Sequence, residues 1–186
     1  MHCYHTCKTD GGRDHVSNVG PFLSGKNEPG KWQWLTQGYY FWTDDPHFAH
    51  IWGRVSYENN YAILKCTLSF QSDMLLDLAG NVSHSLYFNK LIQLYVKKLK
   101  RTNPDVVPTV STVIEHFRKE EKKQPSIFPY QAIKAGDVPG SKADKRKKIK
   151  FTPANDECLP LIPRLQLCLF EEAKENISHK EVYYFT

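Results

Sequence analysis

The chain has 186 residues, a mass of 21.6 kDa and 40% hydrophobic residues, values that fit a single domain (residues 1–186) burying its own core. No apolar run is long enough to span a bilayer, so the composition excludes an integral membrane protein and predicts no membrane partner. The net charge is +5, but much of the excess lies between Lys142 and Lys150, which does not imply a nucleic-acid-binding surface over the whole protein.

The chain contains five cysteines, an odd number, and its N-terminus has no signal-peptide pattern. This combination predicts reduced thiols and a cytoplasmic location. Cys3, His5 and Cys7 would share one face of an N-terminal strand. Consecutive residues on one face of a strand lie too far apart to close a tetrahedral zinc site, so we predict no metal site.

The first predicted element is a strand over His2–Lys8, where the side chains alternate. Residues 9–32 follow as a polar, glycine-containing loop, for which we expect no regular structure. Loops of this length are more often functional lids than simple connections.

Residues 38–53, GYYFWTDDPHFAHIWG, predict a short aromatic strand that breaks at Asp44-Asp45 into a helix. Gly38 allows close approach of the backbone where this strand begins. Pro46 is tolerated in a first helical turn, and the aspartate before it is a good N-cap. The strand offers flat rings with polar tips, which suit a planar, partly polar ligand.

The rest of the chain predicts helices between strands, without regular strand–helix–strand alternation. We expect helices at 85–100 and 108–123 and strands at 61–70, 127–134, 149–152, 165–170 and 182–185. The predicted fold class is α+β, with a split, mainly antiparallel sheet and helices inserted between the N-terminal and C-terminal strands.

Three stretches of this sequence together resemble the ADP-ribosyltransferase fold, in its diphtheria-toxin and poly(ADP-ribose)-polymerase-like branch. Tyr4-His5-Thr6 is similar to the first-strand motif of that branch, an aromatic residue, a histidine and a small residue. Gly38-Tyr39-Tyr40-Phe41 resembles its glycine–aromatic–tyrosine–phenylalanine strand. Arg164 to Leu169 is similar to its late strand, with Gln166 where most active members carry glutamate.

The resemblance implies a binding site for NAD as co-substrate. His5 would donate a hydrogen bond to the ribose next to nicotinamide, and the backbone of Thr6 would bind the carboxamide. Tyr40 would stack on the nicotinamide ring, with Tyr39 or Trp42 packing on the far face of the strand. Gly38 and Tyr39 belong to the same implied cofactor-binding strand.

A second stacking residue is expected in the following helix, where this chain has Ile51, next to Trp52. Gln166 completes the implied catalytic set with His5 and Tyr40. It is uncharged and can only hydrogen-bond the ribose hydroxyl, so Glu171 and Glu172 are candidate substitutes for the usual glutamate. Non-glutamate residues at this place go with mono-ADP-ribosyl transfer or with lost activity, not with polymer synthesis.

The function implied is that of a mono-ADP-ribosyltransferase, which cleaves NAD at the nicotinamide–ribose bond and could also act as an NAD glycohydrolase. Analogy with the family suggests a toxin, effector or phage-defence enzyme, with a neutralising partner protein left open. The acceptor is either protein or nucleic acid, and the basic stretch from Lys142 to Lys150 is a candidate contact for it.

Three alternatives stay open. The domain could be a non-catalytic module that binds NAD or ADP-ribose on the same fold. It could be an RNA-directed enzyme similar to 2′-phosphotransferases, with Arg13, Lys26 and Arg54 as candidate phosphate ligands. It could also be a structural α+β domain, in which case His5 and Tyr40 would lie far apart.

Overall fold

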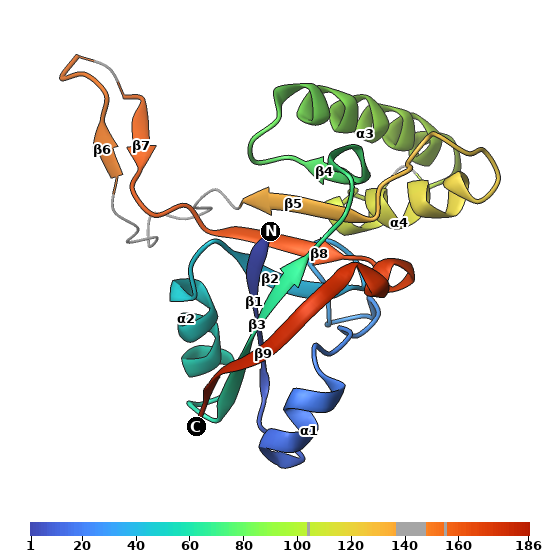
Figure 1. Ribbon diagram of the computed structural model, residues 1–186. Helices are drawn as coiled ribbons and strands as arrows, with labels where there is room; N and C mark the ends of the chain where they lie inside the picture. Colours follow the sequence, from blue (N-terminus) through green and yellow to red (C-terminus); the bar gives the residue numbers. More distant parts are fainter. Residues whose placement is uncertain (104, 137–147, 155) are drawn as a thin grey trace.

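The computed structural model of the protein describes residues 1–103, 105–136, 148–154 and 156–186 (Figure 1). Within these ranges a seven-stranded sheet has the order β4-β5-β8-β2-β1-β3-β9. Its strands are β1 (His2–Lys8), β2 (Tyr39–Thr43), β3 (Tyr61–Leu68), β4 (Leu75–Asp77), β5 (Ala132–Gly136), β8 (Leu165–Leu169) and β9 (Ile177–Phe185). β4 and β5 pair in parallel and the other neighbours are antiparallel. The α+β class with a mainly antiparallel sheet is therefore confirmed.

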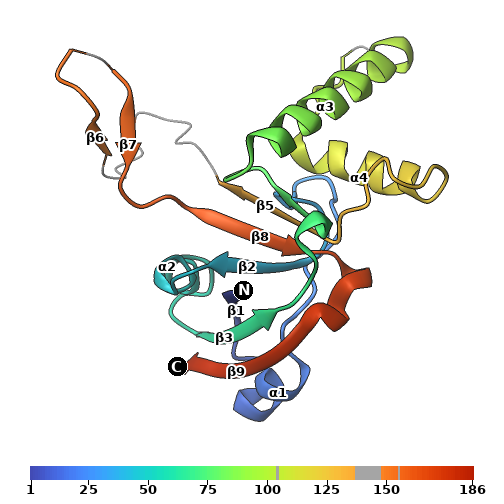
Figure 2. The same ribbon diagram turned by 45° about the horizontal axis from the view of Figure 1, so that its top comes forward.

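The helices lie around the sheet at separate places (Figure 2). They are α1 (Gly12–Val19), α2 (His47–Ser56), α3 (Val82–Thr102) and α4 (Val110–Glu121). α3 and α4 lie together at the β4–β5 end, α1 packs near β9 at the other end, and α2 packs against β1. A small hairpin of β6 (Lys148–Lys150) and β7 (Cys158–Pro160) projects away from the sheet.

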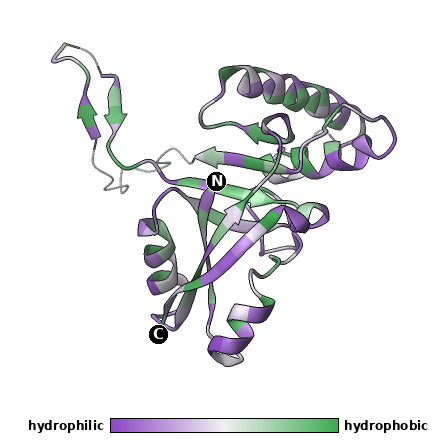
Figure 3. Cartoon of the chain, in the orientation of Figure 1, coloured by the Kyte–Doolittle hydropathy of each residue, from purple (hydrophilic) through white to green (hydrophobic). Residues whose placement is uncertain are grey.

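Apolar side chains from these helices bury the sheet. α3 alternates hydrophobic and hydrophilic residues, as an amphipathic helix does (Figure 3), and its buried residues Phe88 and Leu91 pack in a core that also contains Ile114 of α4. A second core contains Phe41 of β2 and Leu167 of β8 and lies under α1 and β9. The sheet is thus covered by separate apolar clusters.

β1 and β2 pair over only two residues. Cys3 lies opposite Thr43 and Tyr4 opposite Trp42, after which β1 continues with β3 alone as far as Lys8. β2 instead pairs with β8, from Trp42 opposite Gln166 to Tyr39 opposite Leu169. The two central strands therefore diverge, and an opening forms between them.

The short helix α1 was not predicted, because residues 9–32 were expected to be a loop. Gly11 and Gly12 do form a turn, with φ of 80° and 81°, but residues 12–19 continue as a helix. Val16 is the one residue of α1 that is buried. A single buried side chain leaves no apolar periodicity in the sequence to indicate a helix.

The other predicted elements differ mainly at their ends. β5 begins at Ala132 rather than at residue 127, and β9 begins at Ile177 rather than at residue 182. β4 and β7 were missed, because three residues carry no measurable alternation. The N-cap of α2 is Pro46, one residue later than predicted, while the Asp45 carboxylate before it accepts a hydrogen bond of 2.8 Å from the His47 backbone N–H.

The basic stretch predicted as an acceptor contact lies mostly outside the described residues, since it includes 142–147. Lys148 and Lys150 are described, exposed and part of β6, and Lys150 forms an ion pair of 3.1 Å with Asp156. Over the part of the chain that is described, none of the helices combines the length and apolarity that crossing a bilayer requires.

Gly38 lies where β2 packs closely against β8. A Cβ atom at this position would come within 2.4 Å of the Cys168 Sγ and 2.6 Å of the Leu169 backbone oxygen. The close approach expected of this glycine is therefore a contact with the neighbouring strand and not with a ligand.

We predict that Gly38→Ala lowers the free energy of unfolding by on the order of 1–3 kcal/mol, because a backbone oxygen cannot move aside as a side chain can. Gly25→Ala is the matched control, since its Cβ would meet only the Gln33 amide at 3.9 Å. Urea unfolding of both variants measures the difference. Equal stability of the two variants would contradict the packing role of Gly38.

Candidate functional site

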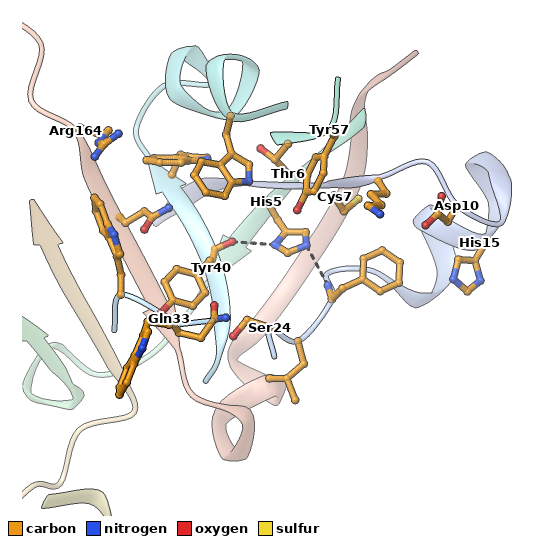
Figure 4. Close-up of a pocket in the computed structure, with 18 residues that line it drawn as sticks. His5, Thr6, Cys7, Asp10, His15, Ser24, Gln33, Tyr40, Tyr57 and Arg164 are labelled. Carbon is orange, nitrogen blue, oxygen red and sulfur yellow. Dashed lines mark hydrogen bonds between the residues drawn. The ribbon is translucent and has the colours of Figure 1, made fainter. Parts of the chain in front are cut away.

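A cavity of about 480 Å³ lies in the opening between β1 and β2 (Figure 4). Its walls come from β1, the segment 10–15 at the start of α1, residues 20–38, β2, α2 and the start of β8, and we refer to it as the central pocket. Arg164 lies at one end, Asp10 and His15 at the other, and His5 and Tyr40 between them. The pocket is therefore elongated and crosses the parted strands.

The His5 imidazole bridges the opening through both of its nitrogens. Nδ1 donates to the Tyr40 backbone oxygen at 2.9 Å, and Nε2 accepts from the Phe22 backbone N–H at 3.1 Å. Because a carbonyl only accepts and an N–H only donates, the ring is the neutral Nδ1–H tautomer. His5 and Tyr40 are adjacent in space, so the separation that would have supported a purely structural domain is not found.

Burial lowers the pKa of the His5 imidazole from 6.5 to about 4, and its hydrogen bond to the Tyr40 carbonyl opposes that shift only in part. Protonation of Nε2 would also place a second ring N–H against the Phe22 backbone N–H, so two donors would face each other. The expected donation from His5 to a ribose is not available in this arrangement, because Nε2 is already an acceptor. His5 instead joins β1, β2 and the Phe22 segment.

The backbone of Thr6 faces the central pocket. Met1 and Leu68 exchange two backbone hydrogen bonds, of 2.9 and 2.8 Å, and β1 stays in register with β3 from there. Backbone groups in an antiparallel pair alternate between facing the partner and facing away from it. The backbone N–H and C=O groups of the even-numbered residues of β1 therefore point away from β3. Those of Thr6 face the opening between β1 and β2.

The Thr6 side chain has a different task. Its hydroxyl donates a hydrogen bond of 3.0 Å to the Ala49 backbone oxygen of α2. Ala49 is fully buried, so the helix comes close to β1 at this point. The contact holds α2 beside the central pocket.

The Tyr40 hydroxyl is held by two backbone groups. It donates to the Thr36 oxygen at 2.8 Å and accepts from the Leu35 N–H at 2.7 Å. Burial raises the pKa of this phenol, so it remains protonated. With its tip anchored inside the protein, Tyr40 presents its ring to the pocket as a rigid flat surface.

Gln166 lies opposite Trp42 in the pairing of β8 with β2, and both side chains line the central pocket. Gln166 is 9% exposed. Within the described residues its side-chain amide makes no hydrogen bond with the protein. The amide is therefore available to a bound molecule.

The central pocket collects four of the predicted site residues: His5, Thr6, Tyr40 and Gln166. Gly38 and Tyr39 do not line it. Gly38 contacts β8, and the Tyr39 ring packs in the core on the opposite face of β2, because neighbouring residues of a strand point to opposite faces. Of the two residues expected on the far face, Tyr39 therefore lies there, and Trp42 shares the face of Tyr40.

Ile51 was also assigned wrongly, because it is Trp52 that lines the central pocket from α2. Each residue turns a helix by about 100°, so a shift of one position changes the face. Trp52 lies one turn after Phe48, and both rings contact Trp42, at centroid distances of 6.2 and 5.8 Å. The second aromatic wall is present, one residue later than predicted.

Carboxylates are scarce in the central pocket. Glu172, a candidate substitute, pairs with Arg118 at 2.5 Å, and neither it nor Glu171 lines the pocket. Among the described residues Asp10 is the one carboxylate in the wall. Arg13, Lys26 and Arg54, the candidate phosphate ligands, lie outside the wall as well.

Trp32, Trp34 and Arg164 also line the central pocket and were not predicted as site residues. Trp32 and Trp34 lie in the segment expected to be an irregular loop, where no periodicity indicates which side chains face a pocket. The signal in the sequence was the occurrence of two tryptophans close together in a polar stretch. In the described parts of the chain, no group of three or more His, Cys, Asp or Glu side chains is arranged to hold a metal ion.

Comparisons with protein-family models, with curated proteins and with solved structures found no match to this chain.

The neutral, buried His5 predicts a pH dependence of stability. Between pH 6.5 and pH 4 the unfolded chain binds a proton at this histidine that the folded protein does not, so the free energy of unfolding falls by about 3 kcal/mol as the pH is lowered. Above pH 6.5 His5 adds no pH dependence. Urea unfolding between pH 4 and 7.5 measures the slope.

His5→Gln, which cannot titrate there, is expected to flatten this slope, whatever it does to stability at pH 7. His179→Gln serves as the control and should keep the wild-type slope, because His179 is exposed in the folded protein. A slope that is the same in wild type and His5→Gln would show that His5 is not held neutral.

Proposed function

We propose that this protein is an NAD-dependent mono-ADP-ribosyltransferase with an ADP-ribosyltransferase-type fold. The observation that carries the proposal is that His5, Tyr40 and Gln166 come from the adjacent strands β1, β2 and β8 and line one pocket. Gln166 follows His5 and Tyr40 by more than half of the chain, so the convergence of the three residues is a property of the fold.

The geometry around Thr6 supports the nicotinamide end of this proposal. One edge of a carboxamide presents an N–H donor beside a C=O acceptor, and the Thr6 N–H and C=O offer the matching pair on the free side of β1. The Tyr40 ring supplies a face for the pyridinium, and Trp52 adds an aromatic surface from α2. The elongated shape of the pocket suits a dinucleotide.

The reaction in this site breaks the bond between C1′ of the ribose and the nicotinamide nitrogen. The electron pair of that bond leaves with nicotinamide, which becomes neutral, and the ribose passes through an oxocarbenium-like state. An acceptor lone pair then bonds to C1′ and the acceptor loses a proton. Gln166 would orient a ribose hydroxyl through its amide, without the charge that a glutamate would add.

His5 acts in this proposal as a positioning residue. Its two hydrogen bonds hold β2 and the Phe22 segment on either side of the central pocket. The wall around Tyr40 depends on that bridge. The ADP-ribose portion of NAD would be contacted by other residues of the wall.

A non-catalytic module that binds NAD or ADP-ribose is the second candidate. The observation that favours it is the absence of a carboxylate beside Tyr40: Asp10, the one carboxylate in the described wall, lies at the far end of the pocket. The phosphotransferase alternative loses support, because its three candidate cations lie outside the wall.

Nicotinamide release from NAD by the purified protein tests the proposal, and Trp52→Ala tests the site. We expect Trp52→Ala to raise KM for NAD roughly tenfold, because stacking on an aromatic face is worth on the order of 1–3 kcal/mol per ring. Trp52 is 43% exposed, so its truncation leaves the core intact.

Val55→Ala is the matched control on the same helix, 76% exposed and away from the wall, and it should keep the wild-type KM. Binding of NAD without nicotinamide release would favour the non-catalytic module. Neither binding nor release, with protein and nucleic-acid acceptors present, would refute the family assignment.

Gln166 provides a test in which activity is gained. Gln166→Glu is expected to raise kcat for nicotinamide release by roughly tenfold or more, because it places a negative charge beside the developing cation, where preorganised groups are worth 10²–10³ in rate. Gln166→Leu, similar in volume, should lower kcat. If both variants keep the wild-type kcat, Gln166 has no part in the chemistry.

A further inference from the structure

The chain has four tryptophans, and all of them line the central pocket. Trp42 is buried and supports the wall, but Trp32, Trp34 and Trp52 are 58%, 42% and 43% exposed. Folding buries large aromatic side chains where it can, and exposed ones gathered at one cavity mark a binding surface. Trp32 and Trp34 come from residues 20–38 and so add a surface beyond the Tyr40 ring.

The segment with Trp32 and Trp34 is held in place by hydrogen bonds. The Asn27 side chain accepts from the Gln33 backbone N–H at 2.7 Å and donates to Glu115 of α4 at 2.6 Å. Backbone bonds between Glu28 and Lys31, of 3.0 and 2.9 Å, close the turn before Trp32. These hydrogen bonds therefore fix the segment that carries Trp32 and Trp34, which reduces the conformational entropy lost when the two rings bind a partner.

Cations lie beside these rings. The Arg164 guanidinium lies 4.9 Å from the centre of the Trp34 ring, and exposed Lys31 precedes Trp32. Among the described residues the wall of the pocket has the cations Arg164 and Lys8 and the single carboxylate Asp10. Flat aromatic surfaces beside cations are the combination that binds single-stranded nucleic acid, whose bases stack while its phosphates pair with the cations.

We infer that the acceptor of this site is a single-stranded nucleic acid, with one base stacked on Trp32 or Trp34 and the chain entering at the Arg164 end of the central pocket. Duplexes are disfavoured because their bases already stack on one another and do not offer a free face. The binding part of this inference stands on the tryptophans alone, whereas the transfer part rests on the proposed function.

In the transfer step a base nitrogen that carries a hydrogen attacks C1′ of the NAD ribose. The new C1′–N bond forms with the nitrogen lone pair, the bond to nicotinamide breaks with its electrons on nicotinamide, and the proton of the attacking nitrogen goes to solvent. The products are nicotinamide and an ADP-ribosylated strand, so no oxidant or further reactant is needed.

Fluorescence anisotropy with 12-nucleotide single strands of mixed sequence tests the binding, in separate DNA and RNA arms, with the corresponding duplexes beside them. We expect at least one single strand to bind more tightly than its duplex. Trp32→Ala and Trp34→Ala should each weaken that binding roughly tenfold, given a stacking contribution of about 1–3 kcal/mol per base. Leu86→Ala, an exposed apolar residue of α3 away from the pocket, should leave it unchanged.

The same oligonucleotides are then incubated with protein and NAD, and their masses are measured by mass spectrometry. Addition of ADP-ribose to the strand that binds, reduced in Trp32→Ala and Trp34→Ala by a larger factor than NAD hydrolysis without a strand, supports the inference. Nicotinamide release with neither DNA nor RNA bound or modified overturns it and leaves the proposed function standing. Binding that is equal for duplexes, or that survives both tryptophan substitutions, also overturns it. Strand binding without any NAD turnover supports the binding part and refutes the proposed function.

Discussion

The parting of β1 from β2 after the Tyr4–Trp42 pair is the feature on which the site depends. Strands that separate in the middle of a sheet expose backbone groups that would otherwise be paired, and a buried unpaired group costs about 1–3 kcal/mol. His5 offsets part of this free-energy cost, because its neutral ring forms hydrogen bonds with the Tyr40 carbonyl and with the Phe22 N–H. The opening remains stable while the backbone of Thr6 is left facing it.

Around that opening the protein places aromatic side chains of two kinds. Tyr40 and Trp42 belong to the sheet and are anchored or buried, so they form fixed walls. Trp32, Trp34 and Trp52 are exposed and come from α2 and from a segment braced against α4. The first set and Trp52 line the proposed NAD site, whereas Trp32 and Trp34 suit a flat partner that reaches the opening from outside.

The sequence predicted the elements with strong periodicity and the residues carried by a motif. α3 and α4 have enough turns to show an apolar stripe, and β1, β2 and β8 carry the three motifs, so His5, Tyr40 and Gln166 could be named in advance. The strand order could not be predicted, because the pairing of β8 between β5 and β2 joins residues far apart in the chain. α1 was missed because it buries only Val16.

The errors in the site have equally local causes. Ile51 and Trp52 are neighbours in the chain, but the rotation of α2 about its own axis decides which of them lines the pocket. A sequence motif alone does not determine that rotation. Tyr39 and Tyr40 are a similar case on a strand, where one position separates the core from the site. Trp32 and Trp34 lie where no regular element assigns a face, so only the folded structure brings them to the pocket.

A crystal structure of the protein with nicotinamide tests the account most directly, because nicotinamide carries both the ring and the carboxamide and is not consumed. We expect its ring on the Tyr40 face and its carboxamide hydrogen-bonded to the N–H and C=O of Thr6. Nicotinamide at another place, or a central pocket left without it at saturating concentration, would contradict the central claim that the parted strands form an NAD site.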